Sequence, residues 1–231
     1  MKETIEGLMV LKNIPLRFTI EEFADRLKMR GEMPEQTGIL LEEALSLISG
    51  KAVFRTCYVD SRSESAVIVN GVSLNSRVLR KQLEKAERVF AYVVTIGGGL
   101  DKKAQSCSDA LQKYYYDEIG NVAVVKVRDY LKEHLQSRFR IKGLSTLGPG
   151  QLRDWPLEGQ RDLFSLLGDV QGAIGVKLTE SLLMRPAKSL SGLYFPTETT
   201  FFACRLCPRA ECPSRKAKYD PTLAEEYDAK G

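Results

Sequence analysis

The segment from Val176 to Thr197, VKLTESLLMRPAKSLSGLYFPT, restricts the possible folds more than any other part of the chain. The polar residues Thr179-Glu180-Ser181 are followed by the apolar run Leu182-Leu183-Met184. Pro186 then prevents a helix from continuing, because proline lacks a backbone donor and clashes with the preceding turn. The residues Ser189–Phe195 have the composition of a strand, and Gly192 within them indicates a bulge or a close backbone approach. The segment therefore predicts a helical turn, a proline stop and an edge strand.

Hydrophobic periodicity along the rest of the chain predicts a mixture of helices and strands. The expected helices span about 20–30, 35–48, 76–86, 110–139 and 157–167. The expected strands span 8–14, 51–59, 66–69, 72–74 and 88–95. Asn70-Gly71 is a strong signal for a hairpin turn between two of these strands. The connection 143–156 is rich in Gly, Ser, Thr and Pro and longer than most connections, which is typical of a functional loop.

Composition indicates an ordinary globular chain and excludes several classes of function. The 231 residues, at 43% hydrophobic and 28% charged, suffice for one substantial core. The net charge is only +4, and no basic face with interleaved aromatic residues indicates nucleic-acid binding. Because no apolar run has the length of a membrane span and the N-terminus lacks a secretory pattern, we expect a cytoplasmic protein without a membrane partner. His134 is the single histidine, which excludes Ser-His-Asp and Cys-His chemistry.

Cys204, Cys207 and Cys212 form a CxxCxxxxC cluster, which predicts a metal centre. Three thiolates are one ligand short of a closed zinc site or of a fully cysteine-bound four-iron cluster. Cys57, a carboxylate such as Glu211, water or a group of a partner are the candidates for the fourth ligand. The spacing leaves an iron-sulfur cluster and zinc both open, although a proline after the last cysteine is similar to ferredoxin-type runs. Reduced cysteines or an incidental disulfide are the structural alternative.

Several short motifs of the chain match, in order and spacing, the signature of one protein family. LTES at 178–181, Pro186-Ala187 and SLSGLYF at 189–195 resemble the signature of the activation domain of cobalamin-dependent methionine synthase. Pro149-Gly150 and Trp155-Pro156 extend this resemblance. It implies an α+β fold in which flanking helices cover a twisted, mainly antiparallel sheet. It also implies an activation-like domain over 1–200, followed by a cysteine-cluster segment and polar tail over 201–231.

Domains of this family bind S-adenosylmethionine and cover the corrinoid while its oxidised, inactive cobalt is reduced and remethylated. The family's binding loop reads Arg-Pro-x-Pro-Gly-Tyr, whereas this chain has Thr146 in place of the arginine and Gln151 in place of the tyrosine. Val125 stands where the family has an acidic residue on its long helix. Because these changes remove the groups that would pair with the charges of the ligand, they imply weak or lost S-adenosylmethionine binding.

The resemblance gives the candidate cofactor-binding residues Gly148, Pro149, Gly150, Arg153, Glu180, Arg185 and Tyr194. Arg153 is a possible substitute for the missing arginine of the loop. Glu180 and Arg185 correspond to the face toward the ligand or the corrinoid, and the structural alternative makes Glu180 a cap or an ion-pair partner. Tyr194 belongs either to the cofactor cleft or to the packing of the sheet, and packing is the default for an aromatic residue in a strand.

We therefore expect an accessory protein that supports the reductive activation of a separate corrinoid methyltransferase or corrinoid protein. In this interpretation the cysteine centre passes or gates an electron, and cobalamin is brought by the partner. One alternative is an S-adenosylmethionine-binding component of cobalamin-dependent methionine synthase. Another is an interaction module in which zinc stabilises the C-terminal segment. No methyl-transfer nucleophile is visible, so whether the chain is itself an enzyme stays open.

Overall fold

The computed structural model describes residues 2–5, 7–16, 19, 21–23, 35–212 and 214–228. The chain divides into two compact units, each built from three segments of sequence. Unit 1 comprises residues 1–53, 93–133 and 169–190, and unit 2 comprises residues 54–92, 134–168 and 191–231. Four elements contribute residues to both units: helix α5 (Ala110–Phe139) and strands β3 (Lys51–Arg62), β6 (Arg88–Thr95) and β10 (Ser189–Pro196).

The strands form one large sheet and one small hairpin. In the large sheet the backbone hydrogen bonds give the order β1 (Lys2–Ile5), β2 (Leu8–Leu11), β3, β6, β10, β7 (Leu144–Leu147). Strand β4 (Ala66–Val69) pairs with β3 and with β5 (Val72–Asn75). The hairpin consists of β8 (Lys177–Leu178) and β9 (Met184–Arg185). The pairs β1–β2, β3–β4, β4–β5, β7–β10 and β8–β9 are all antiparallel.

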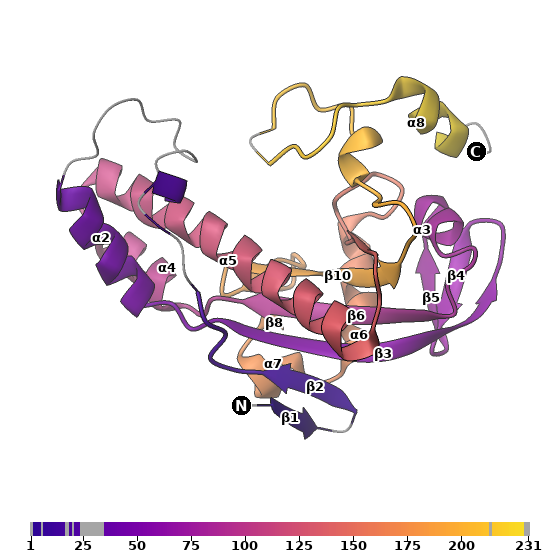
Figure 1. Cartoon of the computed structure of the whole chain (residues 1–231), viewed down its shortest axis with the longest axis horizontal. Helices are drawn as coiled ribbons and strands as arrows, with labels where there is room; N and C mark the ends of the chain where they lie inside the picture. The colour runs from indigo at the N-terminus through magenta and orange to yellow at the C-terminus, as the bar shows by residue number, and fades with distance from the viewer. Residues whose placement is uncertain are drawn as a thin grey trace. The chain divides into compact units, whose positions relative to one another are not determined.

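Unit 1 contains α2 (Glu35–Ser46), α4 (Gly99–Ser106), α7 (Val170–Ile174) and most of α5. Figure 1 shows α2, α4 and the N-terminal part of α5 lying side by side. Glu43 of α2 joins the three helices, because its carboxylate accepts the hydroxyl proton of Tyr116 at 2.7 Å and pairs with Lys103 Nζ at 2.5 Å. Tyr116 is only 1% exposed, so this network is anchored in the core of the unit.

Unit 2 contains α3 (Arg77–Gln82), the 3₁₀ turns η1 (Leu157–Gly159) and η2 (Ala203–Arg205), α6 (Gln160–Leu167) and α8 (Pro221–Asp228). Strand β7 pairs with β10 so that Leu147 lies opposite Leu193. The largest fully buried side chains of this unit include Trp155, Tyr92 and Phe90. These residues form the core on which the predicted ligand-binding loop is built.

Several predicted elements are confirmed. The strand 88–95 and the helix 110–139 occur with the predicted bounds. Asn70 and Gly71 have φ values of 46° and 76° between β4 and β5, as a two-residue hairpin turn requires. A capping box marks the start of the predicted helix 20–30, because Thr19 N–H donates to Glu22 at 3.0 Å and Glu22 N–H to the Thr19 hydroxyl at 3.3 Å. The rest of the predicted helix 20–30 lies outside the described residues beyond position 23.

Two predictions for the segment 176–197 are wrong. The expected helical turn is a β hairpin, because the Thr179 hydroxyl accepts the N–H of Leu183 at 3.1 Å and the Thr179 N–H donates to the carbonyl of Leu183 at 2.9 Å. The expected edge strand is internal, since β10 lies between β6 and β7. The sequence analysis placed a loop over 143–156 and missed strand β7 within it. Strand β7 pairs with β10, so β10 is not an edge strand.

Candidate functional site

The predicted ligand-binding loop follows β7 in unit 2, and its backbone packs against β10 and against the residues that follow the loop. A Cβ at Gly148 would lie 2.6 Å from the carbonyl oxygen of Ser191, so a side chain here would collide with β10. Gly150 has φ +81°, and its N–H donates to the carbonyl of Trp155 at 2.8 Å. Pro149 between them is buried. The backbone of the protein therefore requires both glycines independently of any ligand.

Thr146, which the sequence analysis predicts in place of the family's arginine, is hydrogen-bonded to the interior of unit 2. Its Oγ1 lies 3.0 Å from the hydroxyl oxygen of Tyr92. The ring of Tyr92 stacks on that of Tyr194, with centroids 4.5 Å apart and an interplanar angle of 24°. Both tyrosines are 1% exposed. The structure thus places Tyr194 in the packing of the sheet, which was the default expectation for this residue.

Arg153 is exposed in the same loop and forms no ion pair with another residue in the described part of the chain. Its neighbour Asp154 has a defined role that the sequence analysis missed. The Asp154 carboxylate accepts the N–H groups of Arg77 and Val78, each at 3.0 Å, and also the hydroxyl of Ser76. Asp154 therefore caps the start of α3 and fixes the loop that presents Arg153.

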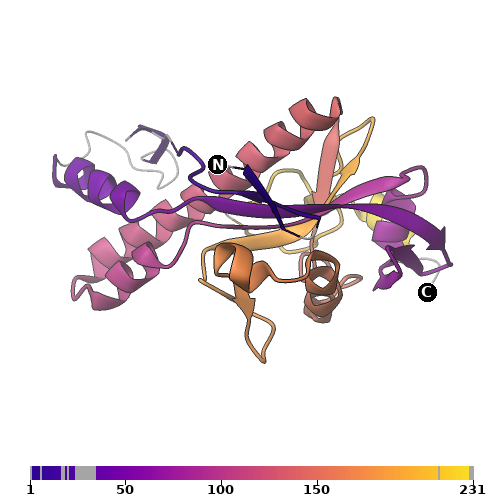
Figure 2. The same cartoon turned by 90° about the horizontal axis from the view of Figure 1, so that it is seen from below.

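Glu180 and Arg185 belong to unit 1, on the β8–β9 hairpin that Figure 2 shows in orange beside α7. Glu180 is exposed in the turn between the two strands. It forms no ion pair with another described residue, and Thr179 rather than Glu180 holds the turn. Arg185 is also exposed, and it lines a hollow of about 620 Å³ within unit 1. Of the predicted site residues in unit 1, Arg185 is thus the one that borders an open volume.

Lys188, three residues after Arg185 in the same unit, is a further polar residue that the sequence analysis missed. Its Nζ donates to Asp117 Oδ1 at 2.7 Å and to Asn121 Oδ1 at 2.7 Å, both on α5. A Cβ at Gly120 would lie 3.1 Å from the methylene groups of Lys188, so the glycine in the long helix permits the close approach of this side chain. Asp117 is thereby already neutralised by a lysine.

A larger hollow, of about 1120 Å³, lies within unit 2 and does not involve the predicted loop. Its walls come from the segment between α3 and β6, from residues 141–143 and from residues 196–200. It contains lysines, an arginine and glutamates together, including Lys85, Arg88, Glu87 and Glu198. Because positive and negative side chains are mixed along these walls, the hollow has no single charge preference.

The three cysteines of the C-terminal cluster are free thiols, each half-buried. Among the residues that the structure describes, no three His, Cys, Asp or Glu side chains are close enough to hold a metal ion. Cys57, the candidate for a fourth ligand, is fully buried in β3, and burial raises the pKa of its thiol above the usual range. The metal centre predicted on Cys204, Cys207 and Cys212 therefore stays a prediction.

Arg215 organises the cysteine segment through backbone carbonyls. Its guanidinium donates to the carbonyl oxygens of Cys204 at 3.2 Å, Ala217 at 3.2 Å and Cys207 at 3.3 Å, and also to that of Arg209. The next residue in the chain donates its N–H to the Cys204 sulfur at 3.4 Å. The guanidinium of Arg215 thus holds the segment together through its backbone carbonyls.

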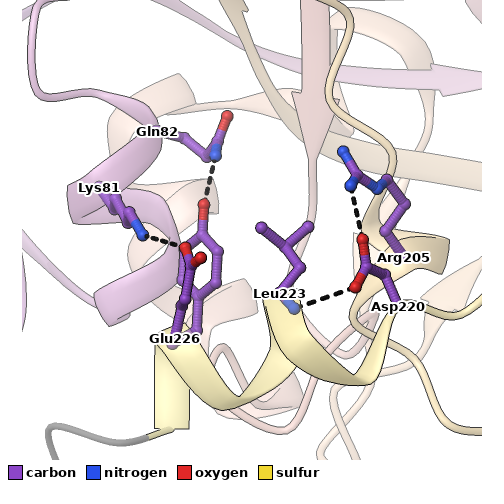
Figure 3. Close-up of polar contacts among 7 residues, drawn as sticks. Lys81, Gln82, Arg205, Asp220, Leu223 and Glu226 are labelled. Carbon is purple, nitrogen blue, oxygen red and sulfur yellow. Dashed lines mark hydrogen bonds and ion pairs between the residues drawn. The ribbon is translucent and has the colours of Figure 1, made fainter.

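Helix α8 docks onto α3 and η2 within unit 2, as Figure 3 shows. Lys81 Nζ lies 3.3 Å from Glu226 Oε2 and 4.3 Å from the ring centroid of Tyr227. At the other end of α8, Asp220 accepts from Arg205 at 2.7 Å and from the N–H of Leu223 at 3.1 Å. The polar tail predicted from the sequence thus contains an ordered, capped helix.

Comparison with known proteins tests the resemblance directly. The family model described as "Vitamin B12 dependent methionine synthase, activation domain" matches residues 155–216. The resemblance to the activation domain is confirmed. This match covers α6, α7, the β8–β9 hairpin, β10 and the cysteine segment. The predicted division at residue 200 stays a prediction, although the match to the activation-domain family continues past it into the cysteines.

A solved structure extends the likeness to the whole fold. The crystal structure of the MetH reactivation domain bound to AdoHcy matches with a TM-score of 0.54 at 17% sequence identity. The match covers 96% of this chain and 89% of that chain. The expected α+β class is therefore confirmed. A search of curated proteins finds no match, and no helix in the described part of the chain has the length and apolar character needed to cross a bilayer.

Proposed function

We propose that the chain is an activation module for a cobalamin-dependent methyltransferase or corrinoid protein, which brings the cobalamin as a separate partner. The observation that carries the proposal is the activation-domain match over residues 155–216, the part of the chain that contains β10 and the β8–β9 hairpin. In this role the chain covers the corrinoid while its cobalt is reduced and remethylated. Cobalt supplies the redox chemistry, and the chain positions the reactants.

The test uses a cobalamin-dependent methionine synthase from which the activation domain has been deleted. Its cobalamin is oxidised to the inactive form, and a chemical reductant, S-adenosylmethionine and the present chain are added. We expect recovery of methionine synthesis and of the visible spectrum of the methylated cofactor only when the folded chain is present. Recovery at the same rate with heat-unfolded chain would overturn the proposal.

The exposed arginines provide matched variants for this assay. Arg153→Ala and Arg185→Ala remove the two exposed arginines among the candidate site residues, whereas Arg161→Ala removes an exposed arginine of α6 outside that set. We expect the first two to slow recovery and the third to leave it unchanged. A uniform effect of all three would show that general surface charge, and not these positions, acts on the partner.

A second candidate function is binding of an S-adenosylmethionine-related ligand by the loop of unit 2. The solved relative was crystallised with AdoHcy, which supports this candidate. Thr146 and Gln151 oppose tight binding, because neither side chain supplies the charge that a carboxylate of the ligand would need. Isothermal titration with S-adenosylmethionine and AdoHcy measures whether the loop binds either ligand. Thr146→Arg is expected to tighten binding. Heat of binding that is absent from both wild type and Thr146→Arg would remove this candidate.

The proposal has a separate part, which is that the C-terminal cysteines hold an iron-sulfur cluster or zinc. Three thiols in one segment are a suitable donor set for either metal, but the described residues do not gather them into a site. No step of the proposed function is therefore assigned to an iron-sulfur or zinc centre of this chain. Anaerobic purification followed by iron, sulfide and zinc analysis tests it, with Cys207→Ser as the variant and Cys107→Ser as the matched control. Metal in wild type and Cys107→Ser that is lost in Cys207→Ser would establish the centre, and its absence throughout would exclude it.

A further inference from the structure

The hollow in unit 1 is a candidate binding site of which the proposed function uses Arg185 alone. It has a volume of about 620 Å³, within the range of sites for small molecules, and it is broadly open to solvent. Its walls come from four neighbouring elements, α4, α7, β8 and β9, and Figure 2 shows three of them as the orange hairpin and its adjacent helix. The lining residues with charged or amide side chains are Asp101, Lys102, Gln105, Gln171, Lys177 and Arg185.

The hollow carries an excess of positive charge. Lys102, Lys177 and Arg185 line it, and within the described residues none of these cations forms an ion pair or a side-chain hydrogen bond. The single carboxylate of the wall, Asp101, already accepts the N–H of Ala187 at 2.9 Å. Three cations and one carboxylate therefore line the hollow, which gives it a net charge of +2. This charge suits an anion with two negative charges.

The element that presents the guanidinium is held in place. The hydrogen bond from Ala187 N–H to Asp101 ties the end of the hairpin to α4. Pro186 lies beside the start of α4, since a Cβ added at Gly98 would be 3.7 Å from Pro186 Cγ. Arg185 directly precedes these contacts, so its backbone is fixed relative to α4 before a ligand arrives. Such pre-ordering lowers the entropic cost of binding.

We propose that this hollow binds a small molecule through its phosphate group. A guanidinium offers a planar pair of donors that matches two phosphate oxygens, and ammonium groups add point charges. Gln105 and Gln171 can donate further hydrogen bonds to the remaining oxygens or to the body of the molecule. A phosphate monoester is close to doubly charged at neutral pH, which matches the surplus of cations over carboxylate.

The test uses the full chain alone with inorganic pyrophosphate as the probe, so its result does not depend on a corrinoid partner. Binding is measured by isothermal titration at constant ionic strength. We expect saturable binding that Arg185→Gln weakens at least tenfold and Lys177→Gln several-fold. Lys113→Gln removes an exposed charge of α5 that does not line the hollow and is expected to leave binding unchanged. Circular dichroism confirms that each variant is folded.

Three outcomes would overturn the proposal. The first is no saturable binding of pyrophosphate, and the second is an equal loss in Lys113→Gln and Arg185→Gln, which would indicate general electrostatic attraction. The third is equally tight binding of malonate, which would show that phosphate chemistry is not selected. Because no corrinoid is present, any of these results leaves the activation proposal standing, and failure of the activation assay leaves the phosphate site standing.

Discussion

The hydroxyl of Tyr92 lies 3.0 Å from Oγ1 of Thr146, which ties the position of the family's missing arginine to a buried tyrosine. Thr146→Val keeps the shape of the side chain and leaves the Tyr92 hydroxyl without this partner. We expect a loss of about 1 kcal/mol in the free energy of unfolding, the usual contribution of such a bond. Urea denaturation followed by circular dichroism measures it.

The matched control is Thr200→Val, which changes an exposed threonine of the same unit. Its unfolding free energy is expected to stay within about 0.5 kcal/mol of wild type, as for most surface substitutions. Equal effects of the two variants would show that the Tyr92–Thr146 contact contributes nothing to stability.

Gly148 and Gly71 separate the two reasons for which a chain needs glycine. At Gly148 a Cβ would meet the Ser191 carbonyl oxygen at 2.6 Å, whereas at Gly71 no atom lies within 4 Å and only the φ of +76° is restrictive. We expect Gly148→Ala to cost about 2 kcal/mol or more through overpacking against backbone, and Gly71→Ala to cost about 1 kcal/mol through the left-handed conformation. Thermal unfolding of the two variants provides the comparison, and a smaller cost at Gly148 would contradict the close approach of β7 to β10.

Local signals in the sequence predicted local structure well. Asn70-Gly71 indicated a hairpin, and the two φ values show that turn. Gly192 indicated a close backbone approach, and a Cβ there would lie 2.8 Å from the carbonyl oxygen of Leu147. The turn at Thr179 was mistaken for helix because a short apolar run does not distinguish helix from strand, and a hydroxyl bond across the turn decided the matter.

Local sequence signals could not predict contacts between residues that are far apart in the sequence. Asp154 caps a helix whose first residues lie 76 to 78 positions earlier, and Lys188 reaches Asp117 across 71 positions. The candidate site was predictable only in part for the same reason. A motif named Arg185 as a candidate, but the neighbouring Lys102 and Lys177 joined it only through the folding of α4 and the hairpin.

Removal of the long-range cap tests how strongly the predicted ligand loop depends on it. Asp154→Ala leaves the first N–H groups of α3 and the Ser76 hydroxyl without their carboxylate. We expect a loss of about 1 to 2 kcal/mol in unfolding free energy, as for other helix caps. Glu64→Ala, at an exposed position of the same unit, serves as the control in urea denaturation. A loss no greater than that of the control would mean that water replaces the cap at little cost.

Tyr116 makes the stability of unit 1 sensitive to high pH. Burial, with the hydrogen bond to Glu43, raises the pKa of Tyr116 to about 12, compared with about 10 in an unfolded chain. A group whose pKa is raised on folding stabilises the protein fully below the unfolded pKa and loses this contribution as pH rises through the folded pKa. We therefore expect unfolding free energy to fall between about pH 10 and pH 12 because of this residue.

The Tyr116→Phe variant isolates this contribution. It removes the hydroxyl donated to Glu43 and should cost about 1 kcal/mol at pH 8. Its unfolding free energy should then decline less than that of wild type from pH 10 to pH 12. Parallel declines in urea denaturation would show that other groups cause the alkaline loss.

Asp220 should make the docking of α8 sensitive to low pH. The N–H of Leu223, and then Arg205, hold the pKa of Asp220 below its usual range by favouring the carboxylate. A group whose pKa is lowered on folding contributes stability above the unfolded value, about 3.9, and this contribution is lost as pH falls through the folded pKa. The cap shown in Figure 3 should therefore hold at neutral pH and fail in acid.

Hydrogen exchange of the α8 amides measures this docking without unfolding the rest of the chain. At neutral pH Asp220→Asn should speed exchange at Leu223 and Ala224, because the amide side chain is a weaker acceptor and cannot pair with Arg205. Glu225→Gln changes an exposed residue of the same helix and should leave that exchange unchanged. After correction for intrinsic exchange, wild type should approach the Asp220→Asn rate as pH falls below the lowered pKa. If wild type keeps its protection in acid while Asp220→Asn is already unprotected at neutral pH, the charge of the carboxylate does not control the docking of α8.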